Sequence, residues 1–264
     1  MKNNIVVKKN DFLKFGYALS LMEQRLLLAC ICQVDSRATL EKDEAFEITV
    51  QEIKDLFAPD STKHLYRDLR EACDRLFERR IVIKSDSKTT KLRWVWKVEY
   101  LDNEAIIRLS FSPDVIPYLS DITERFTKYK VDDVKDFKCI YSLRLYELFA
   151  QHQSLGSREL EVEELRRLFD LGDKYKVFAE LKRSVIDKAI SEINQYSNLT
   201  VTYGERRRSR KVVSLQFAFT TKHKVVTAEK KSLTIDEFVR LNPAKTKGKS
   251  ELEVRKLMKQ QSLA

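Results

Sequence analysis

The stretch LTVTYGERRRSRKVVSLQFAF, residues 199–219, decides the fold that we expect for this chain. Its two ends, Leu199 to Tyr203 and Val212 to Phe219, are rich in apolar and β-branched side chains, and a polar segment separates them. Two such runs around a short polar tip predict a β-hairpin. The preceding residues, Lys174 to Tyr196, carry apolar side chains at helical spacing, so we expect a long helix that leads into the hairpin.

The same half of the chain offers three further elements before this long helix. The apolar spacing predicts a helix over Ile140 to His152, a strand over Leu160 to Val162 and a helix over Glu163 to Phe169, followed by a turn at Gly172-Asp173. Helix, strand, helix, turn, helix and hairpin follow one another in a winged helix, which is a helix-turn-helix with an appended β-hairpin. We therefore expect residues 136–222 to form a winged-helix domain.

The first half of the chain shows the same order with a longer strand region. Helices are predicted over Leu21 to Val34, Gln51 to Phe57 and Lys63 to Arg79, and strands over Ile5 to Val7, Glu47 to Val50, Ile81 to Ile83, Lys91 to Leu101 and Ala105 to Phe111. Polar residues at 59–62 and 85–90 predict a turn and a hairpin tip. The charge pattern of the segment from Ser120 to Phe137 predicts a linker with a short helix near Val131.

The two halves also repeat a sequence pattern. Val50 to Phe57 matches Val162 to Phe169 at an offset of about 112 residues, and at this offset Tyr66, Leu69 and Arg70 fall on similar residues, Phe178, Leu181 and Lys182. Chance similarity between two amphipathic segments is the alternative, but the order of all elements agrees as well. We predict an α+β fold of two tandem winged-helix domains related by pseudo-symmetry, over 1–135 and 136–222, and a basic tail over 223–264.

Composition excludes several classes of protein. The chain has 264 residues, of which 43% are hydrophobic, with only 5 Gly and 4 Pro, which is atypical of a disordered chain. No run of about 18 apolar residues is present, and the N-terminus lacks the pattern of a signal peptide. We therefore expect a cytoplasmic protein that does not bind a membrane.

Cysteine and histidine spacing argues against a metal site or a disulfide. Four cysteines lie in or beside apolar runs without CxxC spacing, and three histidines are far apart in the sequence: Cys30, Cys32, Cys73, Cys139, His64, His152 and His223. We expect the cysteines to be small buried hydrophobic residues in a reduced environment. No cofactor and no metal are predicted.

The positive charge is concentrated in two segments. The formal net charge is +10, of which residues 204–211 (GERRRSRK) carry +4 and residues 222–264 carry +6. Like charges at a hairpin tip repel one another, so an external polyanion such as a phosphate backbone explains them. Solvated surface is the alternative for both segments. We predict DNA contacts from five residues of the tip, namely Arg206, Arg207, Arg208, Arg210 and Lys211.

The long helix of the second half is the candidate for reading bases. Its apolar stripe includes Phe178, Leu181, Val185, Ala189 and Ile193, while Lys176, Glu180, Arg183 and Asp187 recur on another face with Lys182 beside them. A helix in the major groove can place such donors and acceptors against base edges. We predict base contacts from Lys182 and Arg183 and phosphate contacts from Lys174 and Lys176; a solvated face with salt bridges is the alternative.

The first half offers a weaker basic surface. Candidate DNA contacts are Lys63, Arg67 and Arg70 on the helix, with His64 beside them, and Lys88 and Lys91 on the hairpin, which also carries Lys84 and Arg93. Acidic residues are interspersed among them, so this surface is either a secondary DNA contact or a dimer surface. Trp94 and Trp96 are expected on the same side of a strand, in the core or at an interface; a platform for base stacking is the alternative.

Several segments resemble the family of iteron-binding plasmid replication initiators. They are LMEQRL (21–26), Ser112-Pro113, RLYEL (144–148), LKRSVI (181–186), AISEIN (189–194), LTV (199–201) and VSLQFAF (213–219), in the family's order. The resemblance implies monomers that bind repeated double-stranded sites and recruit host replication proteins, and dimers, formed through the first domain, that repress their own gene. The basic cluster of the family's recognition helix falls on Lys182 and Arg183, whereas its third position is Ser184 here.

Three rival functions differ in what they require of the sequence. A nicking enzyme of the rolling-circle type needs a metal held by clustered histidines, and an ATPase needs a phosphate-binding glycine loop; neither pattern is present, so we predict no enzymatic activity. A winged-helix transcription regulator without initiator activity shares the DNA contacts and stays open. A protein-interaction module would need another explanation for the arginine-rich hairpin.

Overall fold

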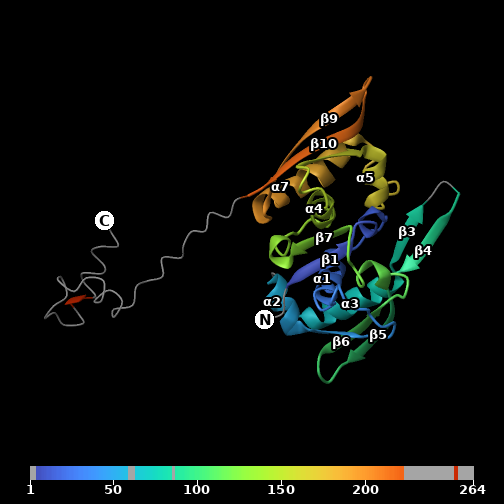
Figure 1. Ribbon diagram of the computed structural model, residues 1–264, viewed down its shortest axis with the longest axis vertical. Helices are drawn as coiled ribbons and strands as arrows, with labels where there is room; N and C mark the ends of the chain where they lie inside the picture. The colour runs from blue at the N-terminus through green and yellow to red at the C-terminus, as the bar shows by residue number, and fades with distance from the viewer. Residues whose placement is uncertain (1–3, 59–62, 85–86, 223–252, 255–264) are drawn as a thin grey trace. The chain divides into compact units, whose positions relative to one another are not determined.

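A computed structural model describes residues 4–58, 63–84, 87–222 and 253–254 (Figure 1). The chain divides into two units, 1–222 and 223–264, and every element below lies in the first. The expected turn at 59–62 and nearly all of the expected basic tail lie outside the described residues, as do residues 85–86 of the expected hairpin tip.

The first half contains the predicted helix-turn-helix elements. These are α1 (Leu21–Ile31), β2 (Phe46–Thr49), α2 (Val50–Phe57), α3 (Leu65–Glu78), β3 (Arg80–Lys84), β4 (Thr89–Arg93), β5 (Val95–Leu101) and β6 (Ile106–Phe111). Ser20 with Glu23 and Thr49 with Glu52 form capping boxes, which satisfy the first amides of α1 and α2 and so fix where both helices begin. Antiparallel strands in the order β2-β6-β5 form one sheet.

The expected continuous strand from Lys91 to Leu101 is wrong. It breaks at Trp94 into β4, which pairs with β3 in a separate two-stranded sheet, and β5, which pairs with β6. A register shift between Val95 and Lys97 changes the side to which the following residue points. Trp94 is therefore 1% exposed in the core and Trp96 is 45% exposed, so the two do not share a side.

The segment from Ser120 to Phe137 is not a linker. It contains β7 (Phe126–Lys130), which pairs antiparallel with β1 (Ile5–Lys9), and a 3-10 turn, η3 (Val131–Asp133). Thr127 and Tyr129 are buried, while Lys128 and Lys130, which alternate with them, are exposed. The abundance of charged residues obscured this alternation, which is the pattern of a half-buried strand.

The second half has the expected winged-helix order. It consists of α4 (Ser142–Ala150), β8 (Ser157–Glu161), α5 (Val162–Leu168), α6 (Phe178–Leu181), a π-helical turn η4 (Lys182–Ile186), α7 (Asp187–Tyr196), β9 (Leu199–Arg208) and β10 (Lys211–Thr221). The strands form a sheet in the order β8-β10-β9. The predicted helix over Lys174 to Tyr196 begins later, at Phe178, because Tyr175 has a φ of 53° that a right-handed helix does not allow.

The two halves touch through the chain before α1, which also includes the 3-10 turn η1 (Phe12–Lys14). Gly16 pairs with Val82 of β3, and a Cβ at Gly16 would lie 2.6 Å from the carbonyl oxygen of Arg167 on α5. Glycine is needed at this position because no other residue allows such a close backbone approach. From α4, Arg144 donates hydrogen bonds to the Tyr17 hydroxyl (2.6 Å) and the Phe15 carbonyl (2.8 Å).

A buried carboxylate joins the β1-β7 pair to α4. The Glu147 Oε1 atom accepts hydrogen bonds from the Lys8 ammonium at 2.6 Å and from the Tyr129 hydroxyl at 2.7 Å. Burial alone raises the pKa of Glu147, but the charges of Lys8 and Arg144, together with the hydrogen bonds from Lys8 and Tyr129, outweigh it, and the pKa is lowered. Glu147 is therefore ionised at neutral pH and needs its partners.

Glu147→Gln is expected to lower the free energy of unfolding at neutral pH by about 3–5 kcal/mol, because it leaves the Lys8 ammonium buried without a counter-charge. A carboxyl with a lowered native pKa stabilises the fold above its unfolded-state pKa of about 4.3, and this contribution is lost as the pH falls through the native pKa. The difference between the two proteins should thus shrink as the pH falls below about 4. Urea denaturation across this range measures it.

Glu163→Gln provides the control, because this α5 carboxylate is exposed. It is expected to change the unfolding free energy by no more than about 0.5 kcal/mol. An equal effect of both substitutions would show that the buried pair does not stabilise the junction.

Candidate nucleic-acid interface

The guanidinium of Arg166 stabilises the turn between α5 and α6. Arg166 on α5 donates hydrogen bonds to the carbonyls of Gly172 (2.9 Å), Lys174 (2.8 Å) and Tyr175 (2.7 Å). The backbone is left-handed at Asp170, Gly172 and Tyr175, with φ between 47° and 53°. Arg166 therefore fixes an unusual turn, and with it the start of α6. Gly172 signals a turn in the sequence, but no spacing rule indicates which cation holds it.

The recognition helix runs through α6, η4 and α7 and presents a polar face. Leu181, Val185, Ala189 and Ile193 are buried and Phe178 is half-buried, so the expected apolar stripe is confirmed. Glu180 and Arg183 are exposed on the opposite side, and in the described part of the chain neither side chain has a hydrogen bond or an ion pair. Arg183 is thus free to meet an external acceptor.

Lys182 is differently placed from its neighbour. Its ammonium donates hydrogen bonds to Asp187 Oδ1 (2.9 Å) and to the hydroxyl of Tyr203 on β9 (2.8 Å), and its side chain is 37% exposed. The Tyr203 hydroxyl in turn donates to Asp187. The ammonium of Lys182 is therefore engaged inside the domain, between the recognition helix and the hairpin.

The two other lysines assigned to this helix lie before it. Lys174 and Lys176 are exposed in the turn between α5 and α6, and the Lys176 ammonium lies 2.9 Å from a carboxylate oxygen of Asp173. Phosphate contacts from these two lysines would therefore come from the turn and not from the helix itself.

The hairpin of β9 and β10 projects beyond the helices as the wing (Figure 1). Two of its arginines are paired, Arg206 with Glu159 of β8 at 3.2 Å and Arg207 with Glu205 at 2.8 Å. The other tip cations, Arg208, Arg210 and Lys211, are exposed and form no ion pair with the described residues. Carboxylates of the same domain thus neutralise part of the positive charge of the hairpin. The cations without an ion pair lie at the tip of the hairpin.

The equivalent helix of the first half has compensated arginines. Arg70 on α3 is paired with Asp102 at 2.5 Å and stacks on the ring of Tyr100, with 4.3 Å from guanidinium carbon to ring centroid. Arg67 is paired with the adjacent Asp68 at 3.2 Å. Lys63 is exposed just before the helix and has no ion pair with the described residues.

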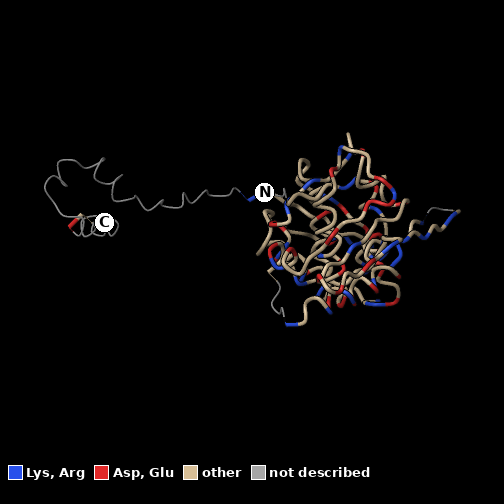
Figure 2. Tube along the Cα trace, turned by 90° about the horizontal axis from the view of Figure 1, so that it is seen from below, with Lys and Arg blue, Asp and Glu red and all other residues tan. Residues whose placement is uncertain are grey.

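The β3-β4 hairpin is a second basic projection. Figure 2 shows Lys and Arg along this arm, which ends in the grey tip. The described residues of the arm, 80–84 and 87–93, include Lys88 and Lys91 and contain no Asp or Glu. At its base Arg93 is paired with Glu78 at 3.4 Å. Lys88 and Lys91 are exposed, in a position that suits a second phosphate contact.

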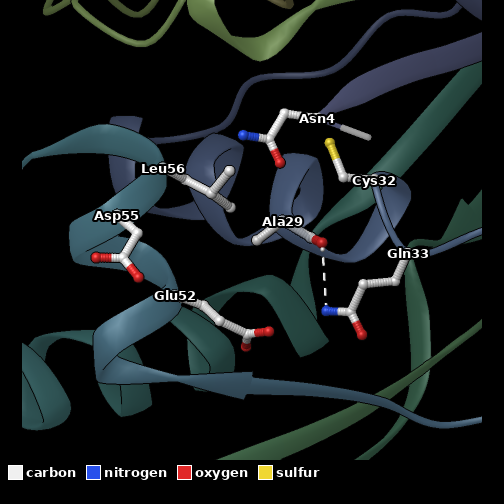
Figure 3. Close-up of a pocket in the computed structure, with 7 residues that line it drawn as sticks. All are labelled: Asn4, Ala29, Cys32, Gln33, Glu52, Asp55 and Leu56. Carbon is white, nitrogen blue, oxygen red and sulfur yellow. Dashed lines mark hydrogen bonds between the residues drawn. The ribbon is translucent and has the colours of Figure 1, made fainter. Parts of the chain in front are cut away.

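A hollow of about 320 Å³ lies between α1 and α2, and no lysine or arginine is among the described residues that line it (Figure 3). Cys32, Glu52 and Asp55 contribute to its lining, and Gln33 closes one side by donating to the Ala29 carbonyl at 3.4 Å. Burial raises the pKa of the Cys32 thiol to about 12, so the thiol is protonated and a poor nucleophile at neutral pH. Cys32 is therefore not a candidate nucleophile in this hollow.

Among the residues that the structure describes, no group of three or more His, Cys, Asp or Glu side chains is placed to hold a metal ion. None of the helices in that part of the chain is both long enough and apolar enough to cross a membrane. The exposed cations of the recognition helix and of the two hairpins are the candidate site.

Helix-turn-helix elements followed by a basic hairpin, present twice, define a tandem winged-helix protein. The family models described as "Initiator Replication protein, WH1" and "Initiator Rep protein, WH2" match residues 5–150 and 161–219. The chain belongs to this family of replication initiators, which confirms the resemblance and the expected fold.

Relatives agree with this assignment. An Escherichia coli "Replication initiation protein" is 25% identical over 235 residues, which cover 86% of this chain and 73% of the relative. The Escherichia coli "PI protein" is 24% identical over 237 residues, covering 76% and 77%. A solved structure, the Pi initiator protein in complex with iteron DNA, matches with a TM-score of 0.71 at 24% identity, over 84% of this chain and 99% of that one. At this identity the match supports the fold.

Proposed function

We propose that this chain initiates plasmid replication by binding directly repeated double-stranded sites (iterons), and that it acts in the cytoplasm by binding, without catalysis. One observation carries the proposal: Arg183 is exposed and unpaired on the recognition helix of a wing domain whose tip cations, Arg208, Arg210 and Lys211, also lack partners among the described residues. Free cations on a helix and on its wing suit the two surfaces of a duplex, base edges and backbone.

Each group of cations has a proposed role. Arg183 suits a bidentate contact with the O6 and N7 atoms of guanine in the major groove. The remaining cations suit phosphate contacts, which supply affinity without sequence information. In the second domain these are Lys174, Lys176, Arg206, Arg207, Arg208, Arg210 and Lys211, and in the first domain Lys63, Arg67, Arg70, Lys88 and Lys91.

Footprinting on the DNA that flanks the gene tests the function. We expect protection of several direct repeats, and replication of an origin plasmid that lacks the gene when the protein is supplied in trans. Protection without rescue of replication would support the alternative, a transcription regulator. No protection of any repeat would reject the proposal.

Arg206→Ala, Arg207→Ala and Arg208→Ala combined are expected to weaken binding equally on repeat and scrambled duplexes. Backbone contacts do not depend on sequence, and each lost phosphate contact lowers the slope of log K against log salt by about one unit. Titrations at several salt concentrations measure both quantities.

A control variant removes three positive charges from another surface, through Arg125→Ala, Lys128→Ala and Lys130→Ala, around β7. It should change the salt slope much less than the wing variant. Equal changes in slope would mean that net charge, and not the wing, determines the slope.

Arg183→Ala is expected to cost about 1–3 kcal/mol on the repeat and to relax base preference at one position, because a single guanine contact is lost. Binding to a panel of single-base variants of the repeat measures the preference. Arg183→Lys keeps the charge but not the two-pronged geometry, so it should bind scrambled DNA as wild type does without restoring the base preference on the repeat. An equal loss of affinity on scrambled DNA after Arg183→Ala would contradict a base contact.

We further propose that the first domain forms a homodimer that represses the protein's own gene, and that host replication proteins bind the DNA-bound monomer. Trp96 supports the first of these, because it is exposed on β5, an edge strand of the β2-β6-β5 sheet. Large exposed aromatic side chains are enriched at interfaces. Sedimentation of the full chain should show association that Trp96→Glu weakens and Trp96→Phe retains. A wild-type chain that stays monomeric at every concentration would reject the dimer.

A further inference from the structure

Three side chains connect the recognition helix with the wing. The Lys182 ammonium donates to Asp187 and to the Tyr203 hydroxyl, and the same hydroxyl donates to Asp187. Tyr203 is fixed in the wing sheet, where its ring lies 5.7 Å from the ring of the buried Phe217. Each of the three groups therefore contacts the other two, although Tyr203 follows Asp187 by 16 residues and Lys182 by 21 residues in the sequence.

The π-helical turn makes this contact possible. Lys182 and Asp187 are five residues apart and span η4 from its first residue to the residue after it. In a regular α-helix, residues five apart point about 140° away from each other, because each residue turns the helix by about 100°. The wider π turn, with its i to i+5 pattern, brings such residues onto one face. The π turn thus places Lys182 and Asp187 on one face, where they form an ion pair.

We propose that Lys182, Asp187 and Tyr203 form a helix-wing lock, a set of positioning residues that fixes the wing relative to the recognition helix, and that Lys182 does not read a base. The inference rests on the proposed DNA binding of this domain. It assigns the base contact to Arg183 alone and gives its neighbour a different task.

The chemistry of the cluster supports this division. Hydrogen bonds with Tyr203 and Asp187 raise the pKa of Lys182, which shows that its protonated form is stabilised where it lies. The ammonium has three N–H donors, and both carboxylate oxygens of Asp187 and the Tyr203 hydroxyl accept from them, so a contact with DNA would replace one of these charge-assisted hydrogen bonds. Arg183 has no such bonds to lose among the described residues. The wing cations can meet the backbone while Arg183 meets a base only if the angle between helix and wing is fixed.

For removal of the Asp187 carboxylate, the helix-wing lock and simple electrostatics predict opposite changes in DNA affinity. Asp187 is a carboxylate on a helix that would face a polyanion, so its removal should strengthen DNA binding if charge alone mattered. It should also do so if Lys182 were a base or phosphate contact that Asp187 restrains. The lock instead predicts that losing Asp187 weakens binding to the specific site.

The experiment uses the full chain and two duplexes: a repeat obtained by selecting wild-type protein against a random-sequence library, and a scrambled duplex of the same composition. Asp187→Asn and Tyr203→Phe are each expected to weaken binding to the repeat by about 5- to 30-fold, the loss expected for one charge-assisted hydrogen bond. Affinity for the scrambled duplex should stay within about 2-fold, because phosphate contacts carry no sequence information. A general loss of structure would instead lower both affinities.

Asp173→Asn is the matched control. It removes one carboxylate from the same domain, at the turn before α6, where Asp173 pairs with Lys176 and has no bond to the wing. It should leave binding to the repeat unchanged or slightly stronger. Because the lock acts as a unit, the double variant Asp187→Asn/Tyr203→Phe should lose less than the product of the two single losses.

The outcomes separate the lock from the proposed function. If Asp187→Asn binds the repeat as tightly as wild type or more tightly, the lock is overturned while the DNA-binding function stands. If selection with wild-type protein enriches no sequence, the proposed function itself fails. Should Asp187→Asn melt before it can be measured, Tyr203→Phe keeps the ring and the charges, and its loss of specificity, or the absence of one, decides the question.

Discussion

A carboxylate that has no access to water organises the junction between the two halves of this molecule. Glu147 can be buried only because Lys8 and Tyr129 bring their donors to it from the first and last strands of the N-terminal half. The strand pair β1-β7 is therefore held against α4 by the buried Lys8–Glu147 ion pair. Loss of either partner would leave the other charge buried without a counter-charge. Arg144, one turn away on the same helix, adds hydrogen bonds to the chain before α1.

The cations proposed to contact DNA differ in whether they have partners inside the protein. Arg70, Arg206 and Lys182 are held by carboxylates of the same chain, whereas Arg183, Arg208 and Arg210 have no carboxylate partner among the described residues. The sequence shows both groups as basic residues of similar spacing. The distinction matters because a cation that is paired with a carboxylate must give up that ion pair to bind a phosphate. A cation without such a partner forms a new ion pair and loses none.

The order of helices and strands was predictable from residues 50–57 and 162–169 and from the two hairpins, because apolar periodicity and polar tips are local signals. Elements fixed by distant contacts were not. β7 is a strand because β1 pairs with it, more than 100 residues away in sequence. The late start of α6 follows from the positive φ of Tyr175, which Arg166 stabilises through backbone carbonyls that no sequence pattern identifies.

Because glycine has no side chain, Gly16 constrains the design of chimeras between members of this family. Because the backbone of α5 approaches this position so closely, the two winged helices share a surface that is complementary at the level of main-chain atoms. A chimera that takes its N-terminal half from one relative and its C-terminal half from another will seat its halves correctly only if the donor supplies a glycine here. A side chain at this position would push the two halves apart and so change the spacing between the two surfaces proposed to bind DNA.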